Sequence, residues 1–323
     1  MIAARAVRAS SDDPLSALEV GEGAEAPPPA DWVRVTVRAA ALNRHDLWSL
    51  QGVGLPADRL PMVLGCDASG VTDDGAEVVV HAVVSDPDFR GDETLDPRRT
   101  LLSELHPGTL AEVVHVPRRN LLPKPAGWSF ERAASLGTAW LTAYRMLFTQ
   151  ARAVPGQTVL VQGAAGGVSN ALVRLGVSAG LRVWVTGRDP GRLARAAAWG
   201  AHGTFETGRR LPERVDAVFE TVGKATWKHS VQSLVPGGCI VVAGATTGGD
   251  PSALLENVFF RQLRVLGSTM GTRDEFARLL RYCEIGDLQA EVDSVHTLPD
   301  AHAAFARLAS GRAVGKVIVT PTR

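Results

Sequence analysis

The feature that most constrains this chain is an apolar run at 158–162 that leads directly into a cluster of small residues. The cluster has the sequence Gly-Ala-Ala-Gly-Gly from Gly163, and a helical spacing of apolar residues begins at Val168. Strand, glycine-rich turn and helix in this order are typical of a dinucleotide site. Glycines allow close approach to a pyrophosphate, and the amide groups at a helix start bind its charge. Because a second apolar strand follows at 181–186, the stretch predicts a nucleotide-binding βαβ unit.

The order of elements along the chain predicts two regions of different architecture. Residues 1–122 have the pattern of strands and turns, with strands expected at 31–40, 78–84 and 110–116. From about 126 to 266 helices alternate with strands, and this predicts a parallel, doubly wound α/β sheet. Its strands are expected at 158–162, 181–186, 215–219, 238–243 and 263–267. The chain closes with helices expected at 272–285 and 299–310 and a strand at 315–320.

Composition excludes several classes of function. The chain has 34 basic and 34 acidic residues, so its formal net charge is zero and gives no electrostatic case for a nucleic-acid or membrane partner. Its three cysteines, Cys66, Cys239 and Cys283, are too dispersed for a disulfide framework or a Cys-x-x-Cys metal knuckle. We find neither a signal peptide nor 18 consecutive apolar residues. These features predict a cytoplasmic protein that acts on a small molecule.

Five motifs occur in an order that resembles one enzyme family. They are Ala-Leu-Asn-Arg-His-Asp-Leu at 41–47, Leu-Gly-Cys-Asp-Ala-Ser-Gly at 64–70, Gly-Ala-Ala-Gly-Gly-Val at 163–168, Asp-Ala-Val-Phe-Glu-Thr-Val-Gly at 216–223 and Leu-Gly-Ser-Thr-Met-Gly at 266–271. The chain resembles the medium-chain dehydrogenase/reductase superfamily, and most of all its zinc-less quinone oxidoreductase-like and alcohol dehydrogenase-like branch. The resemblance implies a GroES-like, β-rich catalytic domain made of residues 1–122 and 267–323. It also implies a Rossmann domain inserted at 123–266, with the active site in the cleft.

The resemblance makes zinc the decisive question. Zinc-dependent members use a cysteine, then a histidine, then a later cysteine or aspartate. Those positions fall on Asn43, on Cys66 and near Ala134 in this chain. A catalytic zinc needs three protein ligands, and neither asparagine nor alanine supplies one. We therefore expect no zinc.

Without a metal, hydrogen bonds must polarise the carbonyl group, or the substrate must not need a Lewis acid. This favours conjugate reduction, in which hydride attacks the β-carbon of an enone, enal or quinone. Asn43 is a candidate amide donor to the enolate oxygen, although it also has the position of a cap for a helix at 44–50. His45 occupies the position of a relay hydroxyl in the superfamily and is a candidate proton donor. It could equally face solvent or serve as a structural hydrogen-bond donor.

Four further residues are expected in or near the substrate pocket: Asp46, Trp48, Cys66 and Asp67. Asp46 matches a structural or cleft-wall aspartate of the superfamily, and Trp48 could line either the pocket or the core. Cys66 could be a nucleophile or redox sensor, but its small neighbours also suit tight packing. No pairing of this cysteine with a histidine is evident in the sequence.

The end of the second strand indicates the cofactor. It has the sequence Thr186-Gly187-Arg188, with no acid to bind a ribose 2′-hydroxyl, so we expect NADPH in preference to NADH. Arg188 could bind a 2′-phosphate with help from Arg192. Asp189 is the rival as a ribose acid, but it precedes Pro190 as the N-cap of a helix expected at 190–199.

The other expected cofactor contacts follow from the turn and from the resemblance. On the turn they are Gly163, Ala165, Gly166, Gly167 and Val168. On the nicotinamide side they are Thr138, Val222, Gly244, Ala245 and Thr246. Lys316 lies at a family-typical position without an assigned role, and Ser169 replaces the last glycine of the family turn.

By resemblance we also expect a homodimer that pairs the edge strand at 264–267. Three functions remain open from the sequence. The first is an NADPH-dependent reductase of quinones or α,β-unsaturated carbonyls. The second is alcohol–ketone interconversion or enoyl-thioester reduction on the same fold, and the third is NADPH binding without catalysis.

Overall fold

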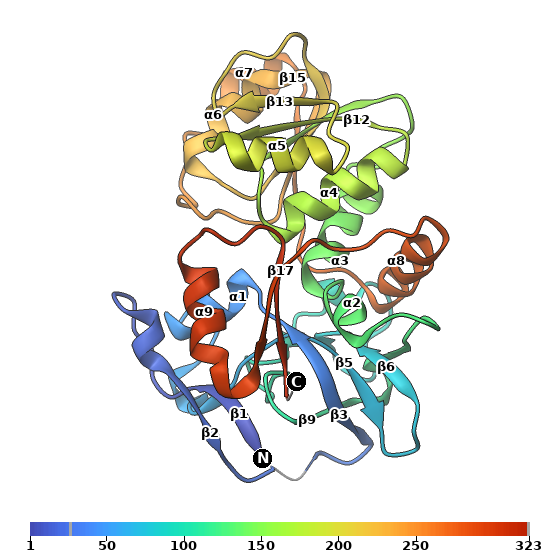
Figure 1. The fold of residues 1–323 in the computed structure, drawn as a ribbon. Helices are drawn as coiled ribbons and strands as arrows, with labels where there is room; N and C mark the ends of the chain where they lie inside the picture. The colour runs from blue at the N-terminus through green and yellow to red at the C-terminus, as the bar shows by residue number, and fades with distance from the viewer. Residues whose placement is uncertain (26–27, 322–323) are drawn as a thin grey trace. The chain divides into compact units, whose positions relative to one another are not determined.

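The computed structural model describes residues 1–25 and 28–321, and the chain divides into two compact units (Figure 1). The β-rich unit comprises Met1–Ala139 and the chain from Thr272 onward. The parallel-sheet unit is Trp140–Gly271. The sequence predicts the limits after residues 122 and 266, so the observed limits lie 17 and 5 residues later along the chain.

The segment from 123 to 139 belongs to the β-rich unit because it is packed and hydrogen-bonded there. Helix α2 (Phe130–Ala134) places two apolar side chains against Ala39, Ala41 and Ile318. The hydroxyl of Ser69 donates to the backbone oxygen of Phe130 at 2.6 Å.

A seven-stranded sheet forms the centre of the β-rich unit. Its main path has the order β10 (Leu121–Pro123), β6 (Glu77–Val80), β5 (Asp67–Thr72), β3 (Trp32–Ala41), β18 (Lys316–Thr320) and β17 (Val292–Thr297), and β9 (Val113–Pro117) also pairs with β3. The pairs are antiparallel except β17 with β18. The register sets Ala41 opposite both Asp67 and Ile318. The end of β3 therefore lies beside the start of β5 and the start of β18.

Smaller elements complete this unit. A three-stranded sheet has the order β2 (Leu18–Glu22), β1 (Ile2–Ala6), β4 (Met62–Val63), and β7 (Val83–Val84) pairs with β8 (Thr100–Leu101). The remaining elements are α1 (Arg44–Leu50), α8 (Arg273–Ile285), α9 (Ala301–Ala309) and the short helices η1 (Pro14–Ala17), η2 (Ala57–Arg59), η3 (Glu93–Leu95), η4 (Arg118–Asn120) and η6 (Leu298–Asp300). Helix α3 (Thr138–Tyr144) begins at the limit of the unit. The main apolar cluster of the β-rich unit includes the buried residues Leu50, Leu64 and Phe305.

A six-stranded sheet, parallel throughout, forms the centre of the other unit. Its order is β13 (Gly203–Glu206), β12 (Arg182–Gly187), β11 (Thr158–Gln162), β14 (Val215–Glu220), β15 (Leu234–Val242), β16 (Arg264–Gly267). Counted from β11, this is the strand order 3-2-1-4-5-6 of a dinucleotide-binding sheet. The predicted parallel sheet is confirmed, and β11 matches its predicted bounds. Strand β13, between the second and third predicted strands, is an addition to the prediction.

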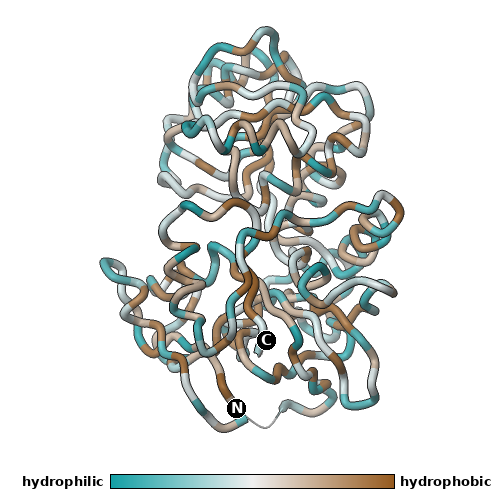
Figure 2. The backbone as a smooth tube through the Cα atoms, in the orientation of Figure 1, coloured by the Kyte–Doolittle hydropathy of each residue, from teal (hydrophilic) through white to brown (hydrophobic). Residues whose placement is uncertain are grey.

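The helices of this unit are α4 (Gly167–Ser178), α5 (Pro190–Ala198), α6 (Lys224–Ser233) and α7 (Leu255–Phe260), with a π-helical turn, η5 (Arg145–Gln150). Strand β11 is buried along its whole length, as expected for a parallel strand covered on both faces. Figure 2 shows hydrophilic residues on many of the peripheral loops, while hydrophobic residues gather inside each unit. Among the described residues, none of the helices has the length and apolar character needed to span a membrane.

Candidate active site

The first turn of α1 is fixed by a buried carboxylate. Asp46 is fully buried, and its Oδ2 accepts the backbone N–H of Asn43 at 2.7 Å. Its Oδ1 accepts the backbone N–H of Gly65 at 3.0 Å. Asp46 therefore joins the start of α1 to the segment that enters β5, and this matches the structural alternative for that residue. Trp48, on the same helix, is half-buried and fits either a pocket or a core position.

A buried ion pair brings together residues from distant parts of the chain. The ammonium group of Lys316 lies 3.0 Å from Asp67 Oδ2 and also donates to Asn43 Oδ1 at 2.7 Å and to the Leu42 backbone oxygen at 2.9 Å. The other carboxylate oxygen, Oδ1, accepts the backbone N–H of Thr138 at 2.7 Å and its hydroxyl at 2.6 Å. We call Asn43, Asp67, Thr138 and Lys316 the Asp67 network.

The Asp67 network gives Lys316 the role that its sequence left unassigned. Its three ammonium protons have three acceptors, so the buried charge is both paired and hydrogen-bonded. A Cβ atom at position 137 would lie 2.5 Å from Asp67 Oδ1, so Gly137 lets the chain approach that carboxylate closely.

The amide of Asn43 is also engaged within the network. Its Nδ2 donates to Asp67 Oδ2 at 2.9 Å and to the Ala41 backbone oxygen at 3.3 Å. A substrate oxygen could accept a hydrogen bond from this amide only in place of one of these acceptors, and the contact with Ala41 is the longer. Donation to substrate by Asn43 stays a prediction.

Beside this network, His45 lies between a thiol and a carboxylate. His45 Nδ1 is 3.5 Å from Cys66 Sγ, and His45 Nε2 is 3.1 Å from Glu104 Oε1. The sulfur is fully buried, whereas the side chains of His45 and Glu104 are 16% and 22% exposed. The structure thus contains a cysteine–histidine contact that is not evident in the sequence, and it adds Glu104 to the candidate site.

Electrostatics within this cluster favour a charged imidazole. Burial opposes the charge, but the hydrogen bond with the Glu104 carboxylate raises the pKa of His45. Burial alone would raise the pKa of Glu104, but its hydrogen bond with His45 brings the pKa below the usual range. Burial raises the pKa of the Cys66 thiol, which disfavours a thiolate. We therefore describe His45 as an imidazolium that lies between the Glu104 carboxylate and the neutral Cys66 thiol.

His45, Asp46 and Cys66 also have the residue types of metal ligands. One ligand atom of each lies within 4.8 Å of the others. Both oxygens of Asp46, however, already accept backbone N–H groups, and the Cys66 sulfur donates to the Leu102 backbone oxygen at 3.3 Å. Hydrogen bonds within the protein thus account for this arrangement.

In the parallel-sheet unit, the glycine-rich turn has the geometry of an anion site. Gly163 follows β11 with φ of +89°, a conformation that favours glycine, and its N–H donates to the Thr186 backbone oxygen at 3.1 Å. Helix α4 begins after Gly166, which is exposed and supplies no side-chain cap for the first helical N–H groups. These N–H groups are suited to a pyrophosphate. Ala165, Gly167, Val168 and the buried Ser169 complete the turn and the first helical positions.

The end of β12 separates a buried hydroxyl from an exposed cation. The Thr186 hydroxyl is buried and donates to Gln162 Oε1 on the neighbouring strand β11. A Cβ atom on Gly187 would lie 2.9 Å from Ala164 Cβ, which keeps β12 and the turn close. Arg188 is exposed and makes no hydrogen bond or ion pair among the described residues. It is therefore available to an anionic ligand.

Asp189 has the structural role that the sequence indicated as one alternative. Its carboxylate caps α5 by accepting the backbone N–H of Arg192 at 2.8 Å, and Pro190 is the first helical residue. The side chain of Arg192 is half-buried in the first turn of the same helix. The exposed end of this strand thus presents Arg188 beside a carboxylate that is already engaged.

Four of the five expected nicotinamide-side residues lie on two loops that are hydrogen-bonded to each other, and the fifth, Thr138, belongs to the Asp67 network. Val222 follows β14, and Gly244, Ala245 and Thr246 follow β15. The N–H of Thr246 donates to the Thr221 backbone oxygen at 3.4 Å, and the N–H of Thr247 donates to that of Val222 at 2.8 Å. Both loops are at the carboxyl edge of the sheet, where open α/β sheets bind their ligands.

Glu220, the last residue of β14, is a fully buried carboxylate that the sequence did not mark as a site residue. Glu220 Oε1 accepts the backbone N–H groups of Val222 and Gly223 at 2.8 and 3.0 Å. Its Oε2 accepts the hydroxyls of Thr226 and Ser230 at 2.8 and 2.7 Å. Gln162 Nε2 lies 2.9 Å from the same Ser230 hydroxyl and connects this Glu220 network to the residue before the glycine-rich turn.

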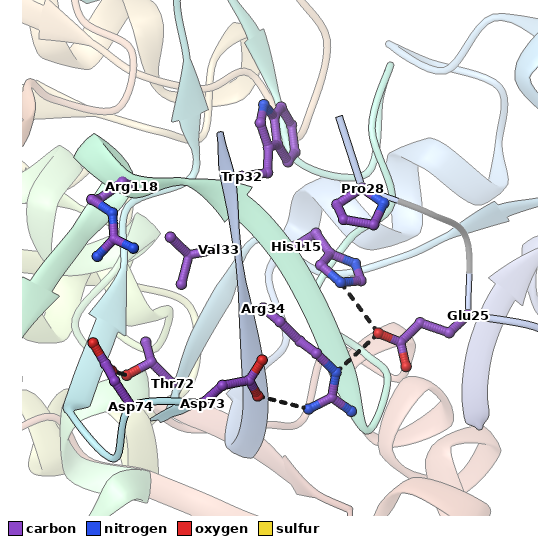
Figure 3. Close-up of a pocket in the computed structure, with 10 residues that line it drawn as sticks. All are labelled: Glu25, Pro28, Trp32, Val33, Arg34, Thr72, Asp73, Asp74, His115 and Arg118. Atoms are coloured by element: carbon purple, nitrogen blue, oxygen red, sulfur yellow. Dashed lines mark hydrogen bonds and ion pairs between the residues drawn. The ribbon is translucent and has the colours of Figure 1, made fainter. Parts of the chain in front are cut away.

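A hollow of about 530 Å³ elsewhere in the β-rich unit contains none of the expected site residues (Figure 3). Four of its titratable groups pair with one another. Glu25 lies 3.0 Å from Arg34 Nε and 3.2 Å from His115 Nε2, and Arg34 Nη1 lies 3.1 Å from Asp73 Oδ1. We assign it no part in the candidate site.

Comparison with known families supports both halves of the predicted fold. Residues 29–126 match the family described as alcohol dehydrogenase GroES-like domain. Residues 200–319 match the family described as zinc-binding dehydrogenase. The predicted GroES-like domain is thereby confirmed.

Similar proteins include free-standing and embedded relatives. A quinone oxidoreductase of Pseudomonas aeruginosa is 29% identical over 90% of this chain and 91% of its own length. The spectinabilin polyketide synthase system protein NorB of Streptomyces orinoci is 31% identical over 92% of this chain. The chain spans 13 to 15% of the length of the curated polyketide synthase relatives it matches.

Two solved structures have the same fold over almost the whole chain. An NAD-dependent alcohol dehydrogenase is 34% identical, with a TM-score of 0.91 and 99% coverage of both chains. A 2-octenoyl-CoA carboxylase reductase in complex with NADP and 2-octenoyl-CoA is 25% identical, with a TM-score of 0.91, and is matched over 99% of this chain and 87% of that chain.

Proposed function

Because the chain belongs to the medium-chain dehydrogenase/reductase superfamily, we propose that it is an NADPH-dependent enzyme that reduces a quinone or an α,β-unsaturated carbonyl without zinc. Its similarity to oxidoreductases supports an enzyme of that general class. The observation that carries the finer proposal is the Asp67 network beside His45. Where zinc-dependent members have zinc ligands, this chain has a buried ammonium–carboxylate pair with a charged imidazole beside it.

The residues of the parallel-sheet unit fit a dinucleotide. The turn after Gly163 and the uncapped first N–H groups of α4 would hold the pyrophosphate. The loops after β14 and β15 would hold the nicotinamide half through Val222, Gly244, Ala245 and Thr246. When bound, the cofactor supplies a hydride equivalent.

Two observations favour NADPH over NADH. Arg188 is exposed and unpaired among the described residues at the end of β12, where a ribose 2′-phosphate is bound in such sheets. The neighbouring carboxylate of Asp189 caps α5 with its Oδ1, which weighs against a role as the ribose acid. A guanidinium can bind a phosphate with two parallel hydrogen bonds.

The three positions of the superfamily's catalytic zinc do not fit a zinc ion. Asn43 Oδ1 accepts from the Lys316 ammonium at 2.7 Å, so this position is already filled by a cation. Ala134 is buried in an apolar cluster and has no donor atom. Only Cys66 offers a zinc ligand among these positions, whereas a catalytic zinc takes three.

The chain's own residues can supply what such a reduction needs. Hydride addition to the β-carbon of an enone moves an electron pair onto the carbonyl oxygen. The resulting enolate needs stabilisation and one proton. The imidazolium of His45 can give that proton. Asn43 would donate to the oxygen by exchanging its long contact with Ala41, and the buried ion pair holds that amide in place.

The test is NADPH oxidation by purified, EDTA-treated protein with a panel of quinones, enones and aldehydes, with NADH in parallel. We expect turnover of a quinone or enone, a preference for NADPH and no gain on adding zinc. Activity that appears only with added zinc would overturn the metal-free proposal. Tight NADPH binding without turnover of any acceptor would favour a binding protein.

Enoyl-thioester reduction is the second candidate function. It is favoured by the similarity to a polyketide synthase protein and to a reductase solved with 2-octenoyl-CoA. The same hydride and proton chemistry applies, since an enoyl thioester is also an α,β-unsaturated carbonyl. A crotonyl thioester in the panel separates this reading from quinone reduction, and simple alcohols with the oxidised cofactor test alcohol–ketone interconversion.

We further propose a homodimer through β16. This strand is at the edge of the parallel sheet, and Val265 is 49% exposed on it. An exposed apolar edge strand favours pairing with another chain. Light scattering should give twice the mass of the chain, and Val265→Lys should give the mass of one chain.

A further inference from the structure

We propose that Glu104 is a positioning residue for the reaction. It holds the His45 ring in one orientation and keeps the ring protonated, so that His45 can give a proton to the substrate after hydride addition. This inference rests on the proposed function, because it concerns the proton step of that reduction. It assigns a role within the loop at 85–105, which carries no recognisable motif.

The turn that follows β8 fixes the Glu104 carboxylate before any substrate arrives. Its Oε2 accepts the backbone N–H of Leu101 at 2.9 Å and the hydroxyl of Thr100 at 3.1 Å. The backbone N–H of Glu104 donates to the Leu101 oxygen at 3.2 Å. One oxygen is thus anchored, and the other, Oε1, faces His45 Nε2 at 3.1 Å. A histidine whose ring nitrogen contacts a fixed carboxylate has its orientation and proton position set by that contact.

The same segment fixes the opposite side of the ring through Cys66. When the Cys66 thiol donates to the Leu102 backbone oxygen at 3.3 Å, its sulfur is an acceptor toward His45 Nδ1 at 3.5 Å. In that arrangement both ring nitrogens are donors, which is the hydrogen-bonding pattern of an imidazolium. Because Cys66 is fully buried, it packs against the ring and does not attack a substrate.

The titratable groups that face His45 come from three elements. Glu104 lies on the turn after β8, Cys66 lies before β5, and Asp46 lies on α1 with His45. Cys66 remains a neutral thiol, and Asp46 is engaged by two backbone N–H groups, so Glu104 is the carboxylate in direct contact with the ring. Removing its charge should therefore lower the proton affinity of His45.

For an enone, hydride adds to the β-carbon and leaves an enolate. The α-carbon of the enolate then takes one proton from His45, which gives the saturated carbonyl compound. The proton on Nδ1 is the more readily released, because sulfur is a weak acceptor. His45 becomes neutral and recovers a proton from water, which reaches its partly exposed side chain. Glu104 stays ionised throughout.

Glu104→Gln tests the inference, with Glu93→Gln as a matched control. Glu93 also contacts a buried histidine of the same unit, with Oε1 at 3.4 Å from His81 Nε2, but lies outside the candidate site. Glu104→Gln should move the basic limb of the kcat/KM profile to lower pH by on the order of one pH unit. At low pH its KM should stay close to that of the wild type. The control should leave the profile unchanged.

Nuclear magnetic resonance of the His45 ring provides a readout that needs no turnover. The His45 signal is identified by its loss in His45→Gln, and its titration midpoint should fall in Glu104→Gln but not in the control. A midpoint that does not move would overturn the inference, even if enones are reduced. A midpoint that falls while no acceptor in the panel is reduced would instead overturn the proposed function.

A second variant covers the case in which Glu104→Gln does not fold. Thr100→Val preserves side-chain shape and removes one of the two anchors of the carboxylate. It should move the midpoint and the basic limb in the same direction by a smaller amount. Circular dichroism confirms that each variant is folded, and an unchanged midpoint in a folded Thr100→Val would count against the positioning role.

Discussion

Two buried carboxylates, one in each unit, are compensated by different means. Asp67 is fully buried and pairs with the ammonium of Lys316 at 3.0 Å, with further donors from Asn43 and Thr138. Glu220 is also fully buried but accepts only from neutral groups, namely two backbone N–H groups and two hydroxyls. One carboxylate depends on a cation, and the other depends on dipoles alone.

The two carboxylates also differ in how far along the chain their donors lie. Lys316 is 249 residues from Asp67, whereas every donor to Glu220 is within ten residues of it. The Asp67 network therefore forms only when both ends of the β-rich unit have assembled, but the Glu220 network forms within one loop and one helix. A long-range charge pair makes the candidate chemical site dependent on the whole unit. A local network shapes a cofactor loop with less dependence on the rest.

Removing the Lys316 cation should have the largest effect on the free energy of unfolding. Lys316→Met leaves the buried Asp67 carboxylate unpaired, and we expect a loss of about 3–5 kcal/mol in the free energy of unfolding. The double variant Asp67→Asn, Lys316→Met should lose less than the sum of the two single variants, because neither charge is left alone. Urea denaturation of all three measures both quantities. A single-variant loss below about 1 kcal/mol would contradict a paired buried charge.

Removing the charge of Glu220 should cost less. In Glu220→Gln the carboxamide oxygen keeps one pair of donors, and its NH₂ group faces the other pair, so we expect a loss of about 1–3 kcal/mol in the same assay. Glu206→Gln, at the exposed end of β13, is the control and should change stability by no more than about 0.5 kcal/mol. A loss as large as that of Lys316→Met would remove the contrast between the two networks.

The exposed end of the parallel sheet should respond in binding and not in stability. Arg188→Ala removes the proposed partner of the 2′-phosphate, so the KM for NADPH should rise by roughly tenfold while that for NADH changes little. Asp189→Ala removes the cap of α5 and should cost about 1 kcal/mol of stability without changing the preference for NADPH. Steady-state kinetics with both cofactors, together with thermal melting, distinguishes the two. An equal effect on both cofactors in Arg188→Ala would argue against NADPH.

The smallest expected effect is a pH dependence of stability that depends on His45. Its raised pKa in the folded state means that protonation of the ring favours folding. This contribution is complete below the unfolded-state pKa of about 6.5 and is lost as pH rises through the folded-state value. The stability advantage of the wild type over His45→Gln should thus decline between about pH 6.5 and about pH 11, by roughly 1 kcal/mol or more. An advantage that grows with pH would reverse the sign of the argument.

The local parts of this protein were predictable from its sequence. The bounds of β11, the glycine-rich turn and the cap of α5 by Asp189 depend on neighbours a few residues apart. Their signals are apolar runs, glycines and a capping pattern, which act through the backbone over short distances. The edge position of β16 followed from the order of strands in a family that the motifs resemble.

The contacts of the candidate site were decided by the tertiary structure alone. The pairing of Lys316 with Asp67 and of Glu104 with His45 joins residues 249 and 59 positions apart, and neither pair has a period or spacing that marks it. Antiparallel register brings the end of β3, the start of β5 and the start of β18 together, and a turn after β8 sets the carboxylate against the ring. The sequence by itself determined which local structures form and which residue types are available to the site. Charge pairing and burial depend on atoms meeting in three dimensions, so only the assembled fold decided which of those residues act together.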